Sequence, residues 1–263
     1  NNDNLITELN ISIEGGVDTR MGVAYDATNG FKFSWAQGDQ VYVIKAEAND
    51  YSYAIFTYSS ENGKFVTGYE TPLVAGEKYY AIYGQAQAIN SFNESVVKAN
   101  MMLGNGGTEM DKLPMLSDVF TATSEGTFAT LHHLCGIVEI PVIGSGDIYE
   151  VGFNAVGSGG ILAGNFNVTF GNDGKVETAT INKEGTEKSA VASKYVEKTD
   201  PLTLSSTPQS IFVAVLPGTY SSLEFDYRPV TNNQYSYKSM DGTLTVQRGK
   251  IHKKTTPVEI NVE

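Results

Sequence analysis

Apolar and polar side chains alternate in short segments along most of this chain. In residues 40–46 (QVYVIKA), Val41 and Val43 flank Tyr42, and the same period of two runs through residues 31–35 (FKFSW). This period places every second side chain on one face of an extended strand. We therefore predict about fifteen short strands, in residues 9–15, 31–35, 40–46, 51–58, 63–68, 78–84, 127–142, 148–156, 164–170, 175–181, 210–218, 222–229, 233–240, 242–249 and 257–263.

Turn residues separate most of these segments. Asn62-Gly63, Pro217-Gly218 and Asp241-Gly242 are pairs typical of tight turns and of positive φ angles. Many short strands with this punctuation favour an all-β fold of two β-sandwiches. The break in residues 143–147 (IGSGD) divides the strands about evenly, so we predict one domain in residues 1–143 and another in residues 144–263. Residues 85–118 have weak periodicity and a glycine cluster, which predicts a long surface loop with one short helical turn.

The segment Trp35-x-x-Gly38-Asp39 is read as a hairpin that joins two strands of the first sandwich. Gly38 can take the positive φ that a short hairpin loop requires, and the Asp39 carboxylate can accept backbone N–H bonds of the turn. We therefore assign this motif a structural role and no active-site role.

Composition excludes some classes of partner. The chain has 18 basic and 30 acidic residues, a net charge of −12, which argues against binding to nucleic acid or to an anionic membrane surface. Aromatic residues are frequent, with 15 Tyr and 12 Phe, and only 18% of residues are charged, which favours half-exposed sheets over helices. No apolar run is long enough for a membrane-spanning helix. The first residue is Asn1 and not Met, which we take to favour an exported, trimmed chain.

Candidate catalytic chemistry is sparse. His132, His133 and Cys135 lie close together, and a Cys–His pair can form a thiolate nucleophile. The surrounding stretch LHHLCGIVEIPV is apolar, however, as in a strand buried on both faces, where a thiol is an inert small side chain. With three histidines and one cysteine in the chain, a closed zinc site would need unrelated carboxylates. We therefore predict that the protein is not an enzyme and binds no metal or cofactor.

Several tyrosines are candidates for sugar stacking. They are Tyr79, Tyr80 and Tyr83 in one predicted strand and Tyr235 and Tyr237 in another. Cross-strand pairing and core packing explain such residues more simply, so we prefer that interpretation for all five.

The order of several motifs resembles the fimbrillin family of type V pilins from Bacteroides-like bacteria, over nearly the whole chain. The motifs are LNISIEGGVDTR, FKFSWAQGDQVYV, EKYYAIYG, TLHHLCGIVEIPV, GGILAGNF, IFVAVLPGTYSSLEF and TLTVQRGKIHKK. The resemblance implies two tandem transthyretin-like β-sandwich domains, export through a lipoprotein precursor, and residence at the outer membrane in a fimbrium. It also implies that a trypsin-like protease removes the N-terminal strand before subunits assemble with other pilin subunits.

Specific residues can be assigned to these steps. Arg20 is the first basic residue and lies in the small-residue segment GGVDTRMG, so we expect cleavage between Arg20 and Met21. Leu9, Ile11 and Ile13 would be the buried face of the strand that cleavage releases. The C-terminal segment repeats this pattern and is the candidate donor strand, through Val258, Ile260 and Val262.

The predicted function is therefore a structural fimbrial subunit that assembles by donor-strand exchange and supports adhesion. The alternative is a monomeric surface module that binds a host glycan or a host protein through loops at the end of a sandwich.

Overall fold

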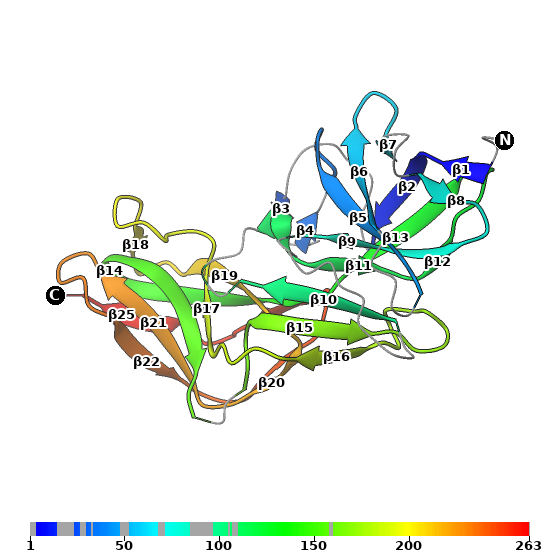
Figure 1. The fold of residues 1–263 in the computed structure, drawn as a ribbon. Helices are drawn as coiled ribbons and strands as arrows, with labels where there is room; N and C mark the ends of the chain where they lie inside the picture. Colours follow the sequence, from blue (N-terminus) through cyan, green and yellow to red (C-terminus); the bar gives the residue numbers. More distant parts are fainter. Residues whose placement is uncertain are drawn as a thin grey trace. The chain divides into compact units, whose positions relative to one another are not determined.

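The protein is described by a computed structural model, which covers residues 4–14, 24–26, 30–32, 34–47, 53–67, 72–84, 97–104, 106, 110–157 and 160–262. In these residues the regular elements are β-strands, with one short 3₁₀ turn at Met110–Lys112, so the all-β prediction is confirmed (Figure 1). The chain divides into two compact units. Unit 1 comprises residues 1–102, 111–133 and 166–182, and unit 2 comprises residues 103–110, 134–165 and 183–263.

The main sheet of unit 1 closes on itself. Each strand in it pairs with the next, and the pairing of β11 with both β13 and β9 completes a ring of seven strands. A closed sheet has no free edge, so each strand of the ring is held on two sides. In order around the ring the strands are β11 (Met115–Ser117), β13 (Thr127–His133), β2 (Glu8–Ile13), β7 (Lys64–Val66), β6 (Tyr53–Ser59), β5 (Gln40–Lys45) and β9 (Lys78–Tyr83), and β12 (Phe120–Thr121) extends β9.

Two small sheets accompany this ring in unit 1. They are the pairs β1 (Leu5–Ile6) with β8 (Leu73–Val74) and β3 (Ala24–Asp26) with β4 (Gly30–Lys32). The core inside the ring is formed by apolar residues at every second position of its strands, as the alternating sequence predicts. Its members include Leu9, Val41, Val43, Phe56, Phe65, Ala81, Met115 and Leu131.

Unit 2 is organised by one long strand, β14 (Gly136–Ala155), drawn as a bent green arrow in Figure 1. Its first half pairs with β19 (Gln209–Val215) on one side and with β24 (Ile251–Lys253) and β25 (Val258–Asn261) on the other. Its second half pairs with β21 (Leu223–Pro229) on one side and with β17 (Ser189–Val191) and β18 (Leu202–Leu204) on the other. The strand therefore belongs to both layers of the unit. β22 (Ser236–Met240) extends the second layer beyond β21.

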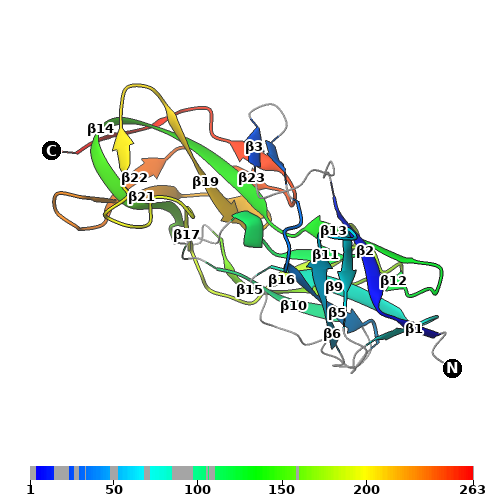
Figure 2. The same cartoon turned by 90° about the horizontal axis from the view of Figure 1, so that it is seen from above.

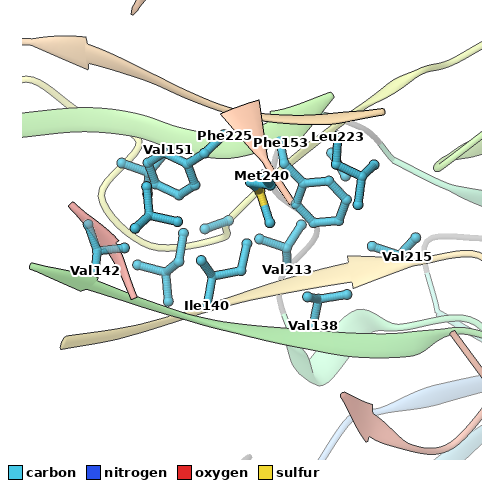
Figure 3. Packing of buried hydrophobic residues seen from close by; sticks show 14 of the residues in the cluster. Val138, Ile140, Val142, Val151, Phe153, Val213, Val215, Leu223, Phe225 and Met240 are labelled. Atoms are coloured by element: carbon cyan, nitrogen blue, oxygen red, sulfur yellow. The ribbon is translucent and has the colours of Figure 1, made fainter. Parts of the chain in front are cut away.

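The core of unit 2 lies between these two layers. Figure 3 shows Val138, Ile140 and Val142 from the first half of β14 pointing toward Val151 and Phe153 from its second half. Side chains of β19, β21 and β22 fill the remaining space, among them Val213, Val215, Phe225 and Met240. The remaining strands of unit 2 are the pair β20 (Gly218–Tyr220) and β23 (Leu244–Val246). A further sheet consists of β10 (Lys98–Leu103), β15 (Gly164–Thr169) and β16 (Thr180–Lys183), most of whose residues belong to unit 1.

Three sequence-based expectations differ from the structure. The predicted boundary between residues 143 and 144 falls inside β14, whereas the nearest change between the two compact units lies between His133 and Leu134. The predicted long loop of residues 85–118 contains strands β10 and β11, because residues 98–103 alternate between partly buried and buried side chains. Residues 85–96 lie outside the described part. The finer expectation of two tandem transthyretin-like sandwiches stays a prediction.

The third difference concerns Trp35-x-x-Gly38-Asp39. Gly38 has a φ of 91°, and the Asp39 carboxylate accepts a hydrogen bond from the backbone N–H of Ala36 at 2.7 Å, as predicted for a turn. The strands on either side do not pair with each other, however, so the hairpin interpretation is wrong. The reason is that β6 and β9 already occupy both edges of β5, while β4 pairs with β3.

Candidate functional site

The predicted removable strand is β2, and it lies inside the closed sheet of unit 1. It pairs in parallel with β13, from Leu9 opposite Thr127 to Ile13 opposite Leu131, and in antiparallel fashion with β7. Figure 2 shows β2 beside β13, with β9 and β11 nearby in the same unit. Removing β2 would therefore open the ring and leave two unpaired strand edges, on β13 and on β7.

The apolar face of β2 is buried unevenly. Leu9 is fully buried, whereas Ile11 and Ile13 are partly buried and pack against the core of unit 1. At about 1.5–3 kcal/mol for a fully buried side chain and about half of that for a partly buried one, the three contribute roughly 3–6 kcal/mol before ordering entropy. Ile6 in β1 is also buried in this core. The face of β2 that was expected to be buried is thus fully buried at Leu9 and partly buried at Ile11 and Ile13.

Trp35 anchors β2 in a way that the sequence did not reveal. Its indole Nε1–H donates a hydrogen bond to the backbone oxygen of Ile11 at 2.9 Å. The ring packs edge-on against Phe65, with centroids 4.7 Å apart, and against Tyr83 at 5.2 Å. The Trp35-x-x-Gly38-Asp39 motif therefore places an aromatic side chain over β2 instead of forming a hairpin.

Both ends of β2 carry a charged contact. At the start of the strand, Glu8 Oε2 lies 2.6 Å from Nζ of Lys64, which belongs to the neighbouring strand β7. Just past its end, Glu14 Oε2 lies 3.0 Å from Nδ1 of His132, and the backbone N–H of Glu14 donates to Leu131 O at 2.8 Å. Asp118 Oδ1 lies 3.4 Å from the other ring nitrogen of His132. The imidazole thus lies between two carboxylates at the point where β2 ends.

The expected cleavage point lies outside the described residues. Neither Arg20 nor Met21 is described, so the structure does not test processing there. β2 ends at Ile13, and the described chain resumes at residue 24. Cleavage after Arg20 stays a prediction.

The candidate donor strand, β25, packs closely against β14, at a place that we call its seat. Val258 and Ile260 are buried in the core of unit 2, and Val262 packs against it. The strand runs parallel to β14, with Val258 opposite Val142 and Ile260 opposite Gly144. A Cβ at Gly144 would lie 1.5 Å from the backbone oxygen of Ile260, and one at Gly146 would lie 2.7 Å from the Cβ of Val262. The Gly-Ser-Gly break thus gives β25 room to approach and is not a linker.

The candidate nucleophile Cys135 is buried, which agrees with an inert thiol. Burial raises its pKa to about 12, because the thiolate would lose its hydration. Cys135 follows the end of β13 and precedes β14, so the predicted single strand of residues 127–142 is two strands. Among the described residues, no group of three or more His, Cys, Asp or Glu side chains could hold a metal ion, and no helix is long and apolar enough to cross a membrane.

The five tyrosines considered for sugar stacking divide into two groups. Tyr79 and Tyr80 are buried and Tyr83 is partly buried against the core of unit 1, so core packing accounts for them. Tyr235 and Tyr237 are exposed, and core packing does not account for these two.

Comparison with known proteins gives a likeness of fold. No family model matches the chain, and no curated protein matches its sequence. A candidate cell adhesion protein of Bacteroides ovatus is similar in structure over 98% of this chain and 92% of its own, with a TM-score of 0.56 and 11% identity. A candidate cell adhesion protein of Bacteroides uniformis covers 97% and 93%, with 14% identity and a TM-score of 0.49.

The tip fimbrial protein Mfa3 of Porphyromonas gingivalis covers 84% of this chain and 90% of its own, with 8% identity and a TM-score of 0.38. The last two TM-scores are below 0.5, so only the likeness to the Bacteroides ovatus protein indicates a shared fold. At 11% identity it concerns the fold alone. The chain therefore has the all-β fold of a protein described as a cell adhesion candidate and not as an enzyme.

Proposed function

We propose that this chain is a structural subunit of a cell-surface fimbrium that assembles by donor-strand exchange and supports adhesion. In this scheme a trypsin-like protease cuts between Arg20 and Met21, β2 leaves the closed sheet of unit 1, and the C-terminal strand of another pilin subunit takes its place. The protein would be exported, through a lipoprotein precursor, to the outer membrane. The observation that carries the proposal is the match between β2, near the start of the chain, and β25, the last strand.

β2 and β25 have the same pairing direction and the same side-chain pattern. Each runs parallel to its longest-paired neighbour, β2 to β13 and β25 to β14. Each presents three apolar residues at alternate positions, which are Leu9, Ile11 and Ile13 in one and Val258, Ile260 and Val262 in the other. A strand that adds to a sheet gains backbone hydrogen bonds from its edge and specificity from such alternating side chains. The segment 258–263 thus has the chemistry to replace segment 9–14.

The two segments also carry a glutamate at matching positions. With Val258 aligned on Leu9, Ile260 falls on Ile11, and Glu263 falls on Glu14. Glu14 contacts His132 in the monomer, so a donor in this register would bring the Glu263 carboxylate to the same imidazole. Slipping the donor by one residue would turn its apolar face outward. The alternating pattern therefore allows this register and registers shifted by two residues, but not those shifted by one.

The exchange costs packing energy, because cleavage also releases β1, whose Ile6 is buried in the core of unit 1 and aligns with Thr255 of the donor. At two of the three positions the donor has Val where β2 has Leu or Ile, which removes about one methylene each and costs about 1 kcal/mol per position. The contact between Glu8 and Lys64 is also lost, because Pro257 takes the place of Glu8 in this alignment. Exchange is therefore favoured only after cleavage, when β2 is no longer tethered to the unit and can dissociate.

The experiment starts from the intact chain. Brief trypsin treatment, followed by mass spectrometry, should release residues 1–20 first, and electron microscopy should then show filaments. A synthetic peptide of residues 257–263 should bind the cleaved protein and not the intact one. The same peptide carrying I260D is the matched control and should not bind, because it would place a charge in the apolar groove.

Two results would contradict this scheme. Filaments formed by a cleaved chain that lacks residues 257–263 would exclude the C-terminal segment as donor. Equal binding of the peptide to intact and cleaved protein would show that β2 does not occupy the acceptor groove.

A further inference from the structure

An exposed cluster on the outer face of β21 and β22 in unit 2 has no part in strand exchange. Phe225 points into the core of unit 2, so its neighbour Asp226 in β21 faces the other side of the sheet, together with Arg228 two residues on. Tyr237 lies directly opposite Asp226 on β22 and shares that face. Tyr235 precedes Tyr237 by two residues and joins it there, with the two rings nearly parallel at 26°.

The backbone around this face is strained at three positions. Four non-glycine residues in the described chain have a positive φ, and three of them, Glu150 at 45°, Tyr195 at 63° and Asn233 at 60°, are connected to this cluster. The Glu150 N–H donates to Tyr195 O at 2.7 Å, and the Tyr149 hydroxyl donates to Oδ1 of Asn233. Such conformations are unfavourable for residues that carry a side chain, and they are concentrated at binding and active sites.

The strain places Glu150 beneath the aromatic side chains. Its position coincides with the register shift between β14 and β21, which re-aims the side chain out of the normal alternation. Glu150 Oε2 accepts a hydrogen bond from the Tyr235 hydroxyl and lies 3.1 Å from Arg228 Nε. The Arg228 guanidinium lies over the Tyr235 ring, 4.1 Å from its centroid, and the centroids of the Tyr235 and Tyr237 rings are 6.3 Å apart. We call this stacked group of a guanidinium and two rings the array.

This array is organised but not covered. Tyr235 is 42% exposed and Tyr237 is 56% exposed, although the residues behind them are held by hydrogen bonds and an ion pair. Asp226, on the same face, is only 5% exposed, and its Oδ1 has no hydrogen-bond partner.

The chemistry of the array suits a sugar better than a protein. Two half-exposed tyrosine side chains offer roughly 200 Å² of aromatic surface, well below the roughly 800 Å² that each partner of a stable protein interface contributes. A pyranose has a C–H face that stacks on a flat aromatic ring and hydroxyls that need both donors and acceptors. Arg228 supplies donors, and Glu150 supplies acceptors. Because these two charges neutralise each other, the array does not select an anionic ligand.

We propose that the face formed by Tyr235, Tyr237, Arg228 and Glu150 is a binding site for a neutral oligosaccharide. The sugar ring stacks on Tyr237, the more exposed of the two rings, and its hydroxyls bond to the polar groups beside Tyr235. This site lies entirely in unit 2 and does not depend on cleavage or on filament assembly.

The test uses the full chain without protease. Affinity gel electrophoresis against neutral glucan, mannan, galactan and xylan, followed by calorimetry with oligosaccharides of the retained polymer, should show binding. Tyr237→Ala should weaken it about tenfold, which corresponds to about 1.4 kcal/mol, because the stacking contact is lost. Tyr237→Phe should bind within about threefold of the parent, because the ring is kept.

Tyr53→Ala is the matched control. Tyr53 is a strand tyrosine of unit 1 that is 47% exposed and lies beside another tyrosine, Tyr42, with ring centroids 6.0 Å apart. This variant should bind as the parent does. Failure of all four polymers to retard the protein, or retention that is equal in Tyr237→Ala, would overturn the proposal. Binding to a glycoprotein that persists after enzymatic removal of its sugars would overturn it in favour of a protein partner.

Discussion

Gly144→Ala tests whether the seat of β25 depends on a missing side chain. In the native backbone the added Cβ would lie 1.5 Å from the oxygen and 2.6 Å from the carbonyl carbon of Ile260. No rotamer change can relieve this overlap, because the Cβ of alanine has no rotamers and the atoms it meets belong to the backbone of Ile260. Either β25 leaves its place on β14 or β14 itself must shift.

The expected loss of stability follows from what β25 buries. Val258 and Ile260 are 8% and 2% exposed, so undocking them removes about 3–6 kcal/mol of gross hydrophobic stabilisation. The freed strand regains part of this as backbone entropy. We therefore expect the free energy of unfolding to fall by about 2–4 kcal/mol, measured by urea denaturation. Hydrogen exchange should show loss of protection at residues 258–261.

Gly242→Ala provides the control for backbone strain. Gly242 has a φ of 88°, which is unfavourable for alanine, but nothing lies within 4 Å of the added Cβ. This variant should lose only about 1–2 kcal/mol, and β25 should remain protected. If Gly144→Ala proved as stable as Gly242→Ala, with β25 still protected, the seat would tolerate a side chain and our reasoning would be refuted. Under the proposed function, Gly144→Ala should also hasten filament growth after cleavage.

Three further predictions concern single side chains. Burial raises the pKa of Asp226 to about 7, so the folded protein keeps a proton that the unfolded chain releases near pH 4, and stability should fall as the pH rises from about 4 to about 7. Asp226→Asn should remove that slope in urea titrations and add on the order of 4 kcal/mol at pH 8, while leaving stability at pH 3 unchanged. Trp35→Phe should lose the bond to Ile11 O, about 1 kcal/mol, and speed hydrogen exchange in β2 relative to β25; equal rates in both strands would argue against an anchoring role. Cys135 should resist iodoacetamide at pH 8 until denaturant is added, and Cys135→Ala should cost about 1 kcal/mol; rapid labelling of the native protein would contradict its burial.

Local patterns in the sequence were sufficient for the strands but not for their partners. The alternation in residues 40–46 and 78–84 predicts β5 and β9, because side-chain burial in a strand has a period of two. The same alternation before Trp35 suggested a hairpin, since nothing local shows that both edges of β5 are taken by β6 and β9. Strand pairing is a long-range property, and a single sequence does not encode it in any short window.

The candidate site shows the same limit. The apolar faces of both terminal strands could be read from sequence, whereas the seat on Gly144 and Gly146 could not. A Gly-Ser-Gly segment is equally compatible with a flexible linker and with a close backbone contact. The missing Cβ gives the chain freedom in a linker, and in this structure it gives β25 room beside β14. The exposed tyrosines were misassigned for a related reason, since period-two spacing places Tyr235 and Tyr237 on one face without saying which face is buried.

The parallel pairing of both terminal strands has a consequence for the order of folding. The bond between Ser12 and Thr130 spans 118 residues, and the bond between Ser145 and Asn261 spans 116. Contacts this distant form late, because the intervening chain must be ordered before they contribute any stability. During synthesis β2 emerges early, yet β13, its parallel neighbour, is made more than a hundred residues later. A nascent chain therefore passes through a period in which the ring of unit 1 is open and the edge that β13 will occupy is free to pair with another strand.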